Sequence, residues 1–95
     1  MLEVDPEFYD RADAHIELSN EQTEKIGRGK VSASMMYATA RFNIWVSATG
    51  FDDQVSMREK KEETVSYFVE QYRKMLEENF DDYESHFARY MKPMK

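Results

Sequence analysis

The middle of the chain holds one charged side chain in an otherwise apolar stretch, and it is the first candidate for chemistry. Arg41 is the sole charged residue between Val31 and Thr49. Its guanidinium must reach solvent, a carboxylate or an aromatic face. The favoured interpretation is a partly buried ion pair with a carboxylate of another helix, because buried arginines are normally paired. The alternative is a small-ligand site in which Arg41, Asn43 and Trp45 bind an anion.

The histidines and acidic residues lack the spacing of a metal or catalytic site. His15 and His86 belong to no Glu-x-x-His or His-x-x-x-His pattern. Asp82 lies one turn before His86, which predicts a local surface pair. The acidic cluster from Glu77 to Glu84 lacks the ligand spacing and central glycine of an EF-hand loop. We therefore expect no metal, no cofactor, no catalytic residue and no enzymatic activity.

The glycine-rich, basic segment from Gly27 to Ser32 could bind an anion through the backbone N–H groups of a following helix. It differs from a phosphate-binding P-loop, which places Ser or Thr directly after the lysine and follows a strand. Here a helix is expected to precede the segment. A solvated turn is the favoured interpretation.

The apolar periodicity predicts helices and no strand. The first helix is expected to begin at Asp5 and Pro6, with the aspartate as its cap, and to end at Gly27. The second is expected from residue 31 or 32 to 49, with Gly50 as its C-terminal cap. The second is apolar on most sides, which is typical of a helix with neighbours on two faces.

The third helix is expected to begin near Asp53 or Ser56 and to reach Tyr90 before Pro93. A break near Asn79, giving a short fourth helix, is the alternative. The fold class predicted from these elements is all-α, an antiparallel three-helix bundle with a long third helix. The whole chain, residues 1–95, is expected to form a single helical domain.

The end of the third helix carries more apolar surface than the other helices can cover. Without a break it would be about 50 Å long, against roughly 30 Å for each of the others. The overhang would expose four aromatic side chains, which we name the aromatic patch: Phe80, Tyr83, Phe87 and Tyr90. A contiguous aromatic patch in water usually marks an interface. It could meet a second copy, fold back, or receive another protein's helix; we favour the homodimer, because it adds core area to a short chain.

Charge and composition exclude several classes of partner. The 95 residues carry a formal net charge of −6 and include no cysteine. An acidic chain argues against binding to nucleic acids and to anionic membranes. The absence of cysteine excludes disulfides and cysteine catalysis. No apolar run reaches the length of a membrane span, and the first residues lack the pattern of a signal peptide. We expect a soluble cytoplasmic protein.

Three stretches resemble a family of small uncharacterised bacterial proteins found mainly in proteobacteria. They are residues 8–13 (FYDRAD), 37–43 (YATARFN) and 71–79 (QYRKMLEEN). The resemblance spans roughly residues 8–83, and the YATARFN stretch is its most specific part. It implies a bacterial, cytosolic, helical protein. It implies no activity, and it gives no residue a catalytic or binding role.

Overall fold

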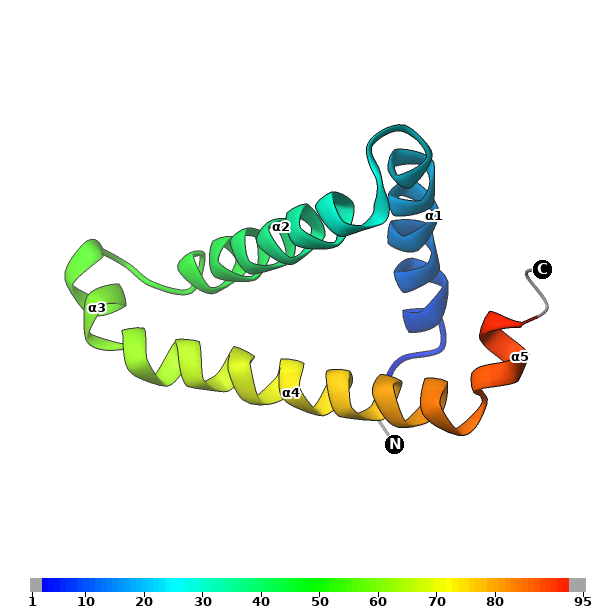
Figure 1. Ribbon diagram of the computed structural model, residues 1–95. Coiled ribbons are helices and arrows are strands. Elements are labelled where there is room, and N and C mark those ends of the chain that lie inside the picture. The colour runs from blue at the N-terminus through cyan, green and yellow to red at the C-terminus, as the bar shows by residue number, and fades with distance from the viewer. Residues whose placement is uncertain (1–2, 93–95) are drawn as a thin grey trace. The chain divides into compact units, whose positions relative to one another are not determined.

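The computed structural model describes residues 3–92, and every regular element in that range is an α-helix (Figure 1). Three helices are long: α1 (Phe8–Ile26), α2 (Arg28–Ala48) and α4 (Lys61–Ser85). Two are short: α3 (Gln54–Glu59) and α5 (Phe87–Met91). The predicted all-α fold with three long helices is confirmed. The prediction for Pro93 lies outside the described residues.

The described helices fall into two compact units, an N-terminal unit of residues 3–54 and a C-terminal unit of residues 55–92. The N-terminal unit holds α1 and α2. The C-terminal unit holds α4, α5 and all of α3 except its first residue. The single domain of residues 1–95 remains a prediction.

Helix α1 begins two residues later than the sequence predicted. Pro6 and Glu7 form a turn, and the backbone N–H of Phe8 donates to the carbonyl of Asp5 at 3.1 Å. The Asp5 carboxylate accepts from the Glu7 N–H and from both terminal nitrogens of Arg11, the shorter of these two contacts being 2.7 Å. The Arg11 hydrogen bond lowers the pKa of Asp5. Asp5 therefore caps a turn ahead of the helix, and Pro6 is not the first helical residue.

Gly27 alone separates α1 from α2. Its φ of 96° and ψ of 148° lie where a side chain is strongly disfavoured. Gly29 and Lys30 are already helical, so the expected turn over residues 27–32 is wrong: α2 begins at Arg28. The two glycines have different roles, because only Gly27 needs its conformational freedom.

Gly50 does not cap α2 in the left-handed conformation. The helix ends at Ala48. Thr49, the residue that follows it, is right-handed, and the N–H of Gly50 donates to the carbonyl of Ser47 at 3.0 Å. Gly27 is the only glycine with a positive φ in the described range. The predicted glycine cap at this end is therefore wrong.

Contact between α1 and α2 lies near their connection, and the two helices then diverge (Figure 1). Val31, in the first turn of α2, is the one buried residue among residues 3–92. Further along, the Ser19 hydroxyl contacts the Met35 sulfur at 3.4 Å. Val31 and Met35, one turn apart, therefore mark the side of α2 that meets α1.

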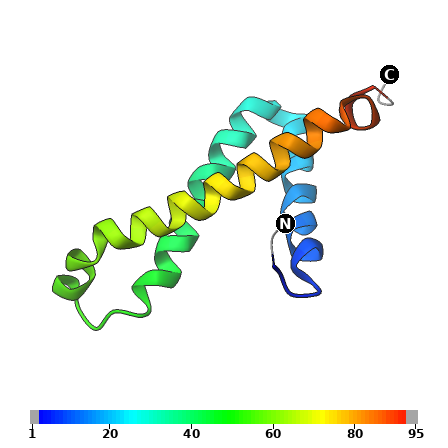
Figure 2. The ribbon, with the colours of Figure 1, turned by 90° about the horizontal axis from the view of Figure 1, so that it is seen from below.

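The predicted third helix is three helices. Helix α3 begins at Gln54, near the predicted Asp53, so Ser56 lies inside it and is not its cap. The first interruption is Lys60 and the second is His86; neither lies near Asn79. Asn79 is helical, and its side-chain amide donates to the carbonyl of Met75 at 2.7 Å. Figure 2 shows α4 as one unbroken helix and α5 turned out of its axis.

Candidate interaction surface

One side of α4 carries a continuous series of apolar side chains, which we name the α4 face: Val65, Phe68, Val69, Tyr72, Met75, Leu76, Phe80 and Tyr83. They recur at intervals of three and four residues and cover an arc of about 140° at about 100° per residue. An apolar arc this wide is typical of a helix that packs against others. Most of these side chains are exposed here, and Phe68 and Met75 are half-buried.

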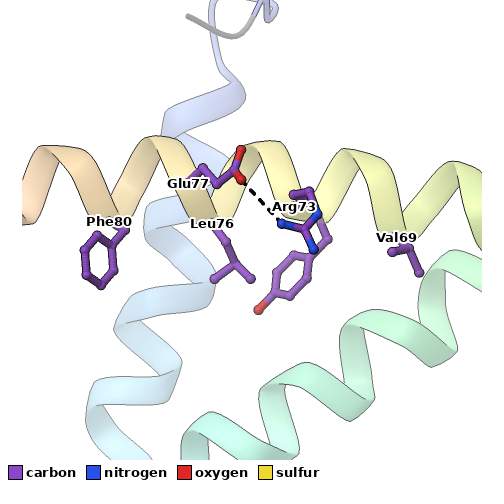
Figure 3. A pocket seen from close by; sticks show the side chains of 6 residues that line it. Val69, Arg73, Leu76, Glu77 and Phe80 are labelled. Carbon is purple, nitrogen blue, oxygen red and sulfur yellow. Dashed lines mark hydrogen bonds and ion pairs between the residues drawn. The ribbon is translucent and has the colours of Figure 1, made fainter.

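A shallow hollow of 460 Å³ lies on the α4 face, between Val69, Tyr72, Arg73, Leu76, Glu77 and Phe80. Figure 3 shows Val69, Leu76 and Phe80 projecting from the same side of the helix. The ion pair between Arg73 and Glu77, at 3.4 Å, lies beside them (Figure 3). Because one helix supplies every lining residue, the hollow is an open groove between side chains and not an enclosed cleft.

The aromatic patch is exposed, as the sequence predicted. Phe80 is 71% exposed, Tyr83 49%, Phe87 56% and Tyr90 37%. Its last two members lie on α5, because the chain leaves the helical conformation at His86. The turn stacks the ring of Tyr90 on that of Tyr83, with centroids 4.4 Å apart. The chain does change direction between α4 and α5, and the stacked rings of Tyr83 and Tyr90 cover each other only in part. The role of the patch as an interface remains a prediction.

Asp82 holds the α4–α5 corner together. Its carboxylate pairs with His86 at 3.2 Å and accepts a hydrogen bond of 2.8 Å from the Tyr90 hydroxyl. The predicted local pair of Asp82 and His86 is thus present. The part played by Tyr90 was missed, although residues 82, 86 and 90 are spaced by four and so would share one side of a continuous helix.

The hydrogen bond to Asp82 raises the pKa of Tyr90 above its ordinary value of 10.0. Neutral Tyr90 donates this bond, so its contribution to stability is complete below pH 10.0 and is lost as the pH rises through the raised pKa. We expect NMR titration of the Tyr90 ring to give a midpoint above 10.0, and Asp82→Ala to return it toward that value. Glu84→Gln, a neighbouring loss of charge, is the control. An unchanged midpoint in Asp82→Ala would contradict the assignment.

The residues of the predicted ligand site do not all meet. Arg41 is exposed, and no ion pair joins it to another residue of 3–54. Trp45, one turn later, stacks on Phe42 with ring centroids 5.8 Å apart. Asn43 is two residues from both Arg41 and Trp45, and residues at that spacing point to different sides of a helix. The ligand site and the ion pair of Arg41 both remain predictions.

Residues 3–92 hold no group of three or more His, Asp or Glu side chains placed to bind a metal ion. None of the helices in this range is both long enough and apolar enough to cross a membrane.

Comparison with known proteins places the chain in a family. Residues 8–84 match the model of the family described as "Protein of unknown function (DUF3144)". The chain is also similar to a solved structure, the NMR structure of the protein NB7890A from Shewanella sp. That chain is 38% identical, with a TM-score of 0.77, and the match covers 97% of this chain and 98% of the other. No curated protein matches. Because the family model spans most of its length, the chain belongs to the DUF3144 family of proteins of unknown function.

Proposed function

We propose that this protein is a small cytoplasmic interaction module that acts as a homodimer through the α4 face and the aromatic patch. The observation that carries the proposal is the exposure of this surface, from Val65 to Tyr90, in a chain whose described part buries only Val31. Folding must offset a large loss of conformational entropy, and apolar burial is the main term that does so. Apolar side chains that stay in contact with water contribute little to the free energy of folding.

A second copy is the occupant that the helix lengths favour. Helix α4 is about 38 Å long, whereas α1 and α2 are about 28 and 32 Å. Neither α1 nor α2 is long enough to cover α4 from end to end. The aromatic patch lies at the C-terminal end of α4 and on α5. A two-fold dimer doubles the helices available and is the commonest oligomer of soluble proteins. We assign no catalytic role to any residue. The acidic net charge supports neither a nucleic-acid nor a membrane partner.

Light scattering and sedimentation equilibrium test the proposal directly. At micromolar concentration we expect a mass twice the 11.3 kDa of one chain, with dissociation on dilution. The midpoint of thermal unfolding should rise with protein concentration, because association stabilises the folded state by mass action. A folded species with the mass of one chain over the whole range would overturn the proposal.

A further inference from the structure

We propose that Gly27 is a hinge between two forms of the N-terminal unit. The bent form is that of the structure, with α1 and α2 as separate helices. In the continuous form α1 and α2 are one helix, which pairs antiparallel with the same helix of a second copy. The inference goes beyond the proposed homodimer, because this contact uses α1 and α2 and not the α4 face.

The start of α2 has few features of a helix N-terminus. No side chain caps it, and its first turn holds no acidic residue but does hold Arg28 and Lys30, whose positive charges oppose the helix dipole. Helical hydrogen bonds already reach Gly27 from both sides: its N–H donates to the Thr23 carbonyl at 3.0 Å, and the Val31 N–H donates to the Gly27 carbonyl at 3.3 Å. A change at Gly27 alone would therefore make the helix continuous, and the N–H groups of the first turn of α2 would gain carbonyl acceptors.

One mostly apolar spacing runs through both helices and keeps its phase across Gly27. In α1 the spacing alternates between three and four residues, and its members are Tyr9, Ala12, Ile16, Ser19, Thr23 and Ile26. The same count continues in α2 at positions 30, 33, 37, 40, 44 and 47. We name this set of positions the seam. An unbroken alternation of three and four is the heptad spacing of a coiled coil, so the sequence suits one long helix across the junction.

Helix α1 of the same copy cannot cover the part of the seam on α2. Ala40 and Ile44 each follow Val31 or Met35 by nine positions, about two and a half turns, and so lie opposite to the side that meets α1. The junction of one residue fixes this rotation. In the continuous form the two halves of the seam are in line and cannot meet each other either.

Antiparallel pairing of two continuous helices, centred near residue 28, matches the seam in size. Each large side chain then lies opposite a small one of the other copy, in the pairs Ala12 with Ile44, Ile16 with Ala40, and Ser19 with Tyr37. The larger members are exposed in the bent form, Ile16 by 48% and Tyr37 by 67%. Pairs of large and small residues let two helices approach closely along their whole length.

Charge supports the same pairing. Among the positions that flank the seam, Asp13 and Arg41 are the only Asp, Glu, Lys or Arg residues. They occupy equivalent flanking positions of the heptad, which antiparallel pairing brings together, so Asp13 of each copy meets Arg41 of the other. In the bent form both side chains are exposed, and no ion pair joins Arg41 to another residue of 3–54.

A distance measured within one chain tests the hinge. Ala14→Cys and Thr39→Cys, both exposed and off the seam, carry spin labels in a chain that has no other cysteine. Double electron–electron resonance, with the labelled chain diluted in unlabelled chain, gives the distance between them. In the continuous form it is about 38 Å, and in the bent form it is shorter, because Ser19 contacts Met35.

We expect Gly27→Ala to raise the ratio of the long to the short distance roughly five-fold or more, because alanine disfavours only the bent form. Gly29→Ala is the matched control and should change the ratio less than two-fold, since Gly29 is helical in both forms. Equal ratios in the two variants, or no population near 38 Å in Gly27→Ala, would overturn the inference.

A charge exchange tests the pairing by sedimentation equilibrium, in a chain that carries Gly27→Ala and Phe80→Asp so that pairing through the α4 face is weakened. We expect Asp13→Arg and Arg41→Asp each to raise the dimer dissociation constant roughly three-fold or more, and the two together to restore it within two-fold. Asp13→Arg with Lys25→Asp makes the same net change of charge and should not restore it.

Equal restoration by Lys25→Asp would show that net charge controls association, and a chain that stays at the mass of one copy in this background would exclude the pairing; either result would overturn the inference. The proposed homodimer fails on a different observation, the mass of one copy in the chain that retains Gly27 and Phe80. The two failures are therefore distinct.

Discussion

Replacing Gly27 by alanine is expected to lower the free energy of unfolding by about 1–3 kcal/mol, the cost of holding a side chain in a sparsely populated backbone conformation. The φ of 96° at this position is the cause. A Cβ atom placed there meets nothing within 4 Å, so steric contact with the rest of the chain contributes nothing to the loss. Urea denaturation followed by circular dichroism measures the change.

Gly29→Ala is the matched control for this substitution. Gly29 lies two residues away inside α2, and a Cβ atom there also meets nothing within 4 Å. Alanine should therefore raise the free energy of unfolding by about 0.5–1 kcal/mol, because it restricts the unfolded chain and favours the helix. Equal effects of the two substitutions would show that the backbone conformation of Gly27 does not hold the connection.

Phe80→Asp is expected to raise the dimer dissociation constant by roughly 30-fold or more, the effect of losing an aromatic anchor at an interface. Phe80 is the most exposed member of the aromatic patch and also borders the groove on α4. In the proposed dimer its ring would be covered, so a carboxylate at this position would lose hydration without gaining a partner. Sedimentation equilibrium measures the change.

Tyr67→Asp is the control on the same helix. Tyr67 is also aromatic and is 60% exposed, but it lies about 140° around the helix axis from Phe80. We expect the dimer dissociation constant of this variant to change less than three-fold. Equal dissociation of both variants would show that the α4 face is not the contact surface.

The sequence predicted the helices well where apolar spacing or glycine marked them. Helix α1 ends at Gly27, whose positive φ is readily adopted by glycine and disfavoured for other residues. The predicted start of α2 is wrong because two glycines close together indicate a turn, whereas Gly29 lies in the first turn of the helix. The sequence alone does not show which backbone conformation a glycine adopts.

The breaks in the predicted third helix carried no comparable signal. Lys60 has φ of −101° and ψ of 10°, and His86 has φ of −120° and ψ of 33°. These are backbone conformations with negative φ that do not require glycine. Asn79 was the expected breaker, yet its amide bonds within the helix. Residue type alone therefore could not locate either interruption.

The candidate surface was predictable in kind but not in detail. The spacing of aromatic residues along the third helix indicated an exposed stripe, and the four predicted side chains are exposed. The stack of Tyr83 on Tyr90 depends on the turn at His86, so it could not be read from helical spacing. Asn43 lies on a different side of α2 from Arg41 and Trp45, and the ligand site formed by these three residues remains a prediction.

The connection between α1 and α2 is a single residue, Gly27, so it cannot absorb a change in length. Adding or deleting a residue there would rotate one helix about its axis by about 100° and turn Val31 away from α1. If Gly27 became helical instead, α1 and α2 would join into a single rod roughly 60 Å long. The backbone angles of Gly27 thus decide whether the first half of this polypeptide is two helices in contact or one continuous rod.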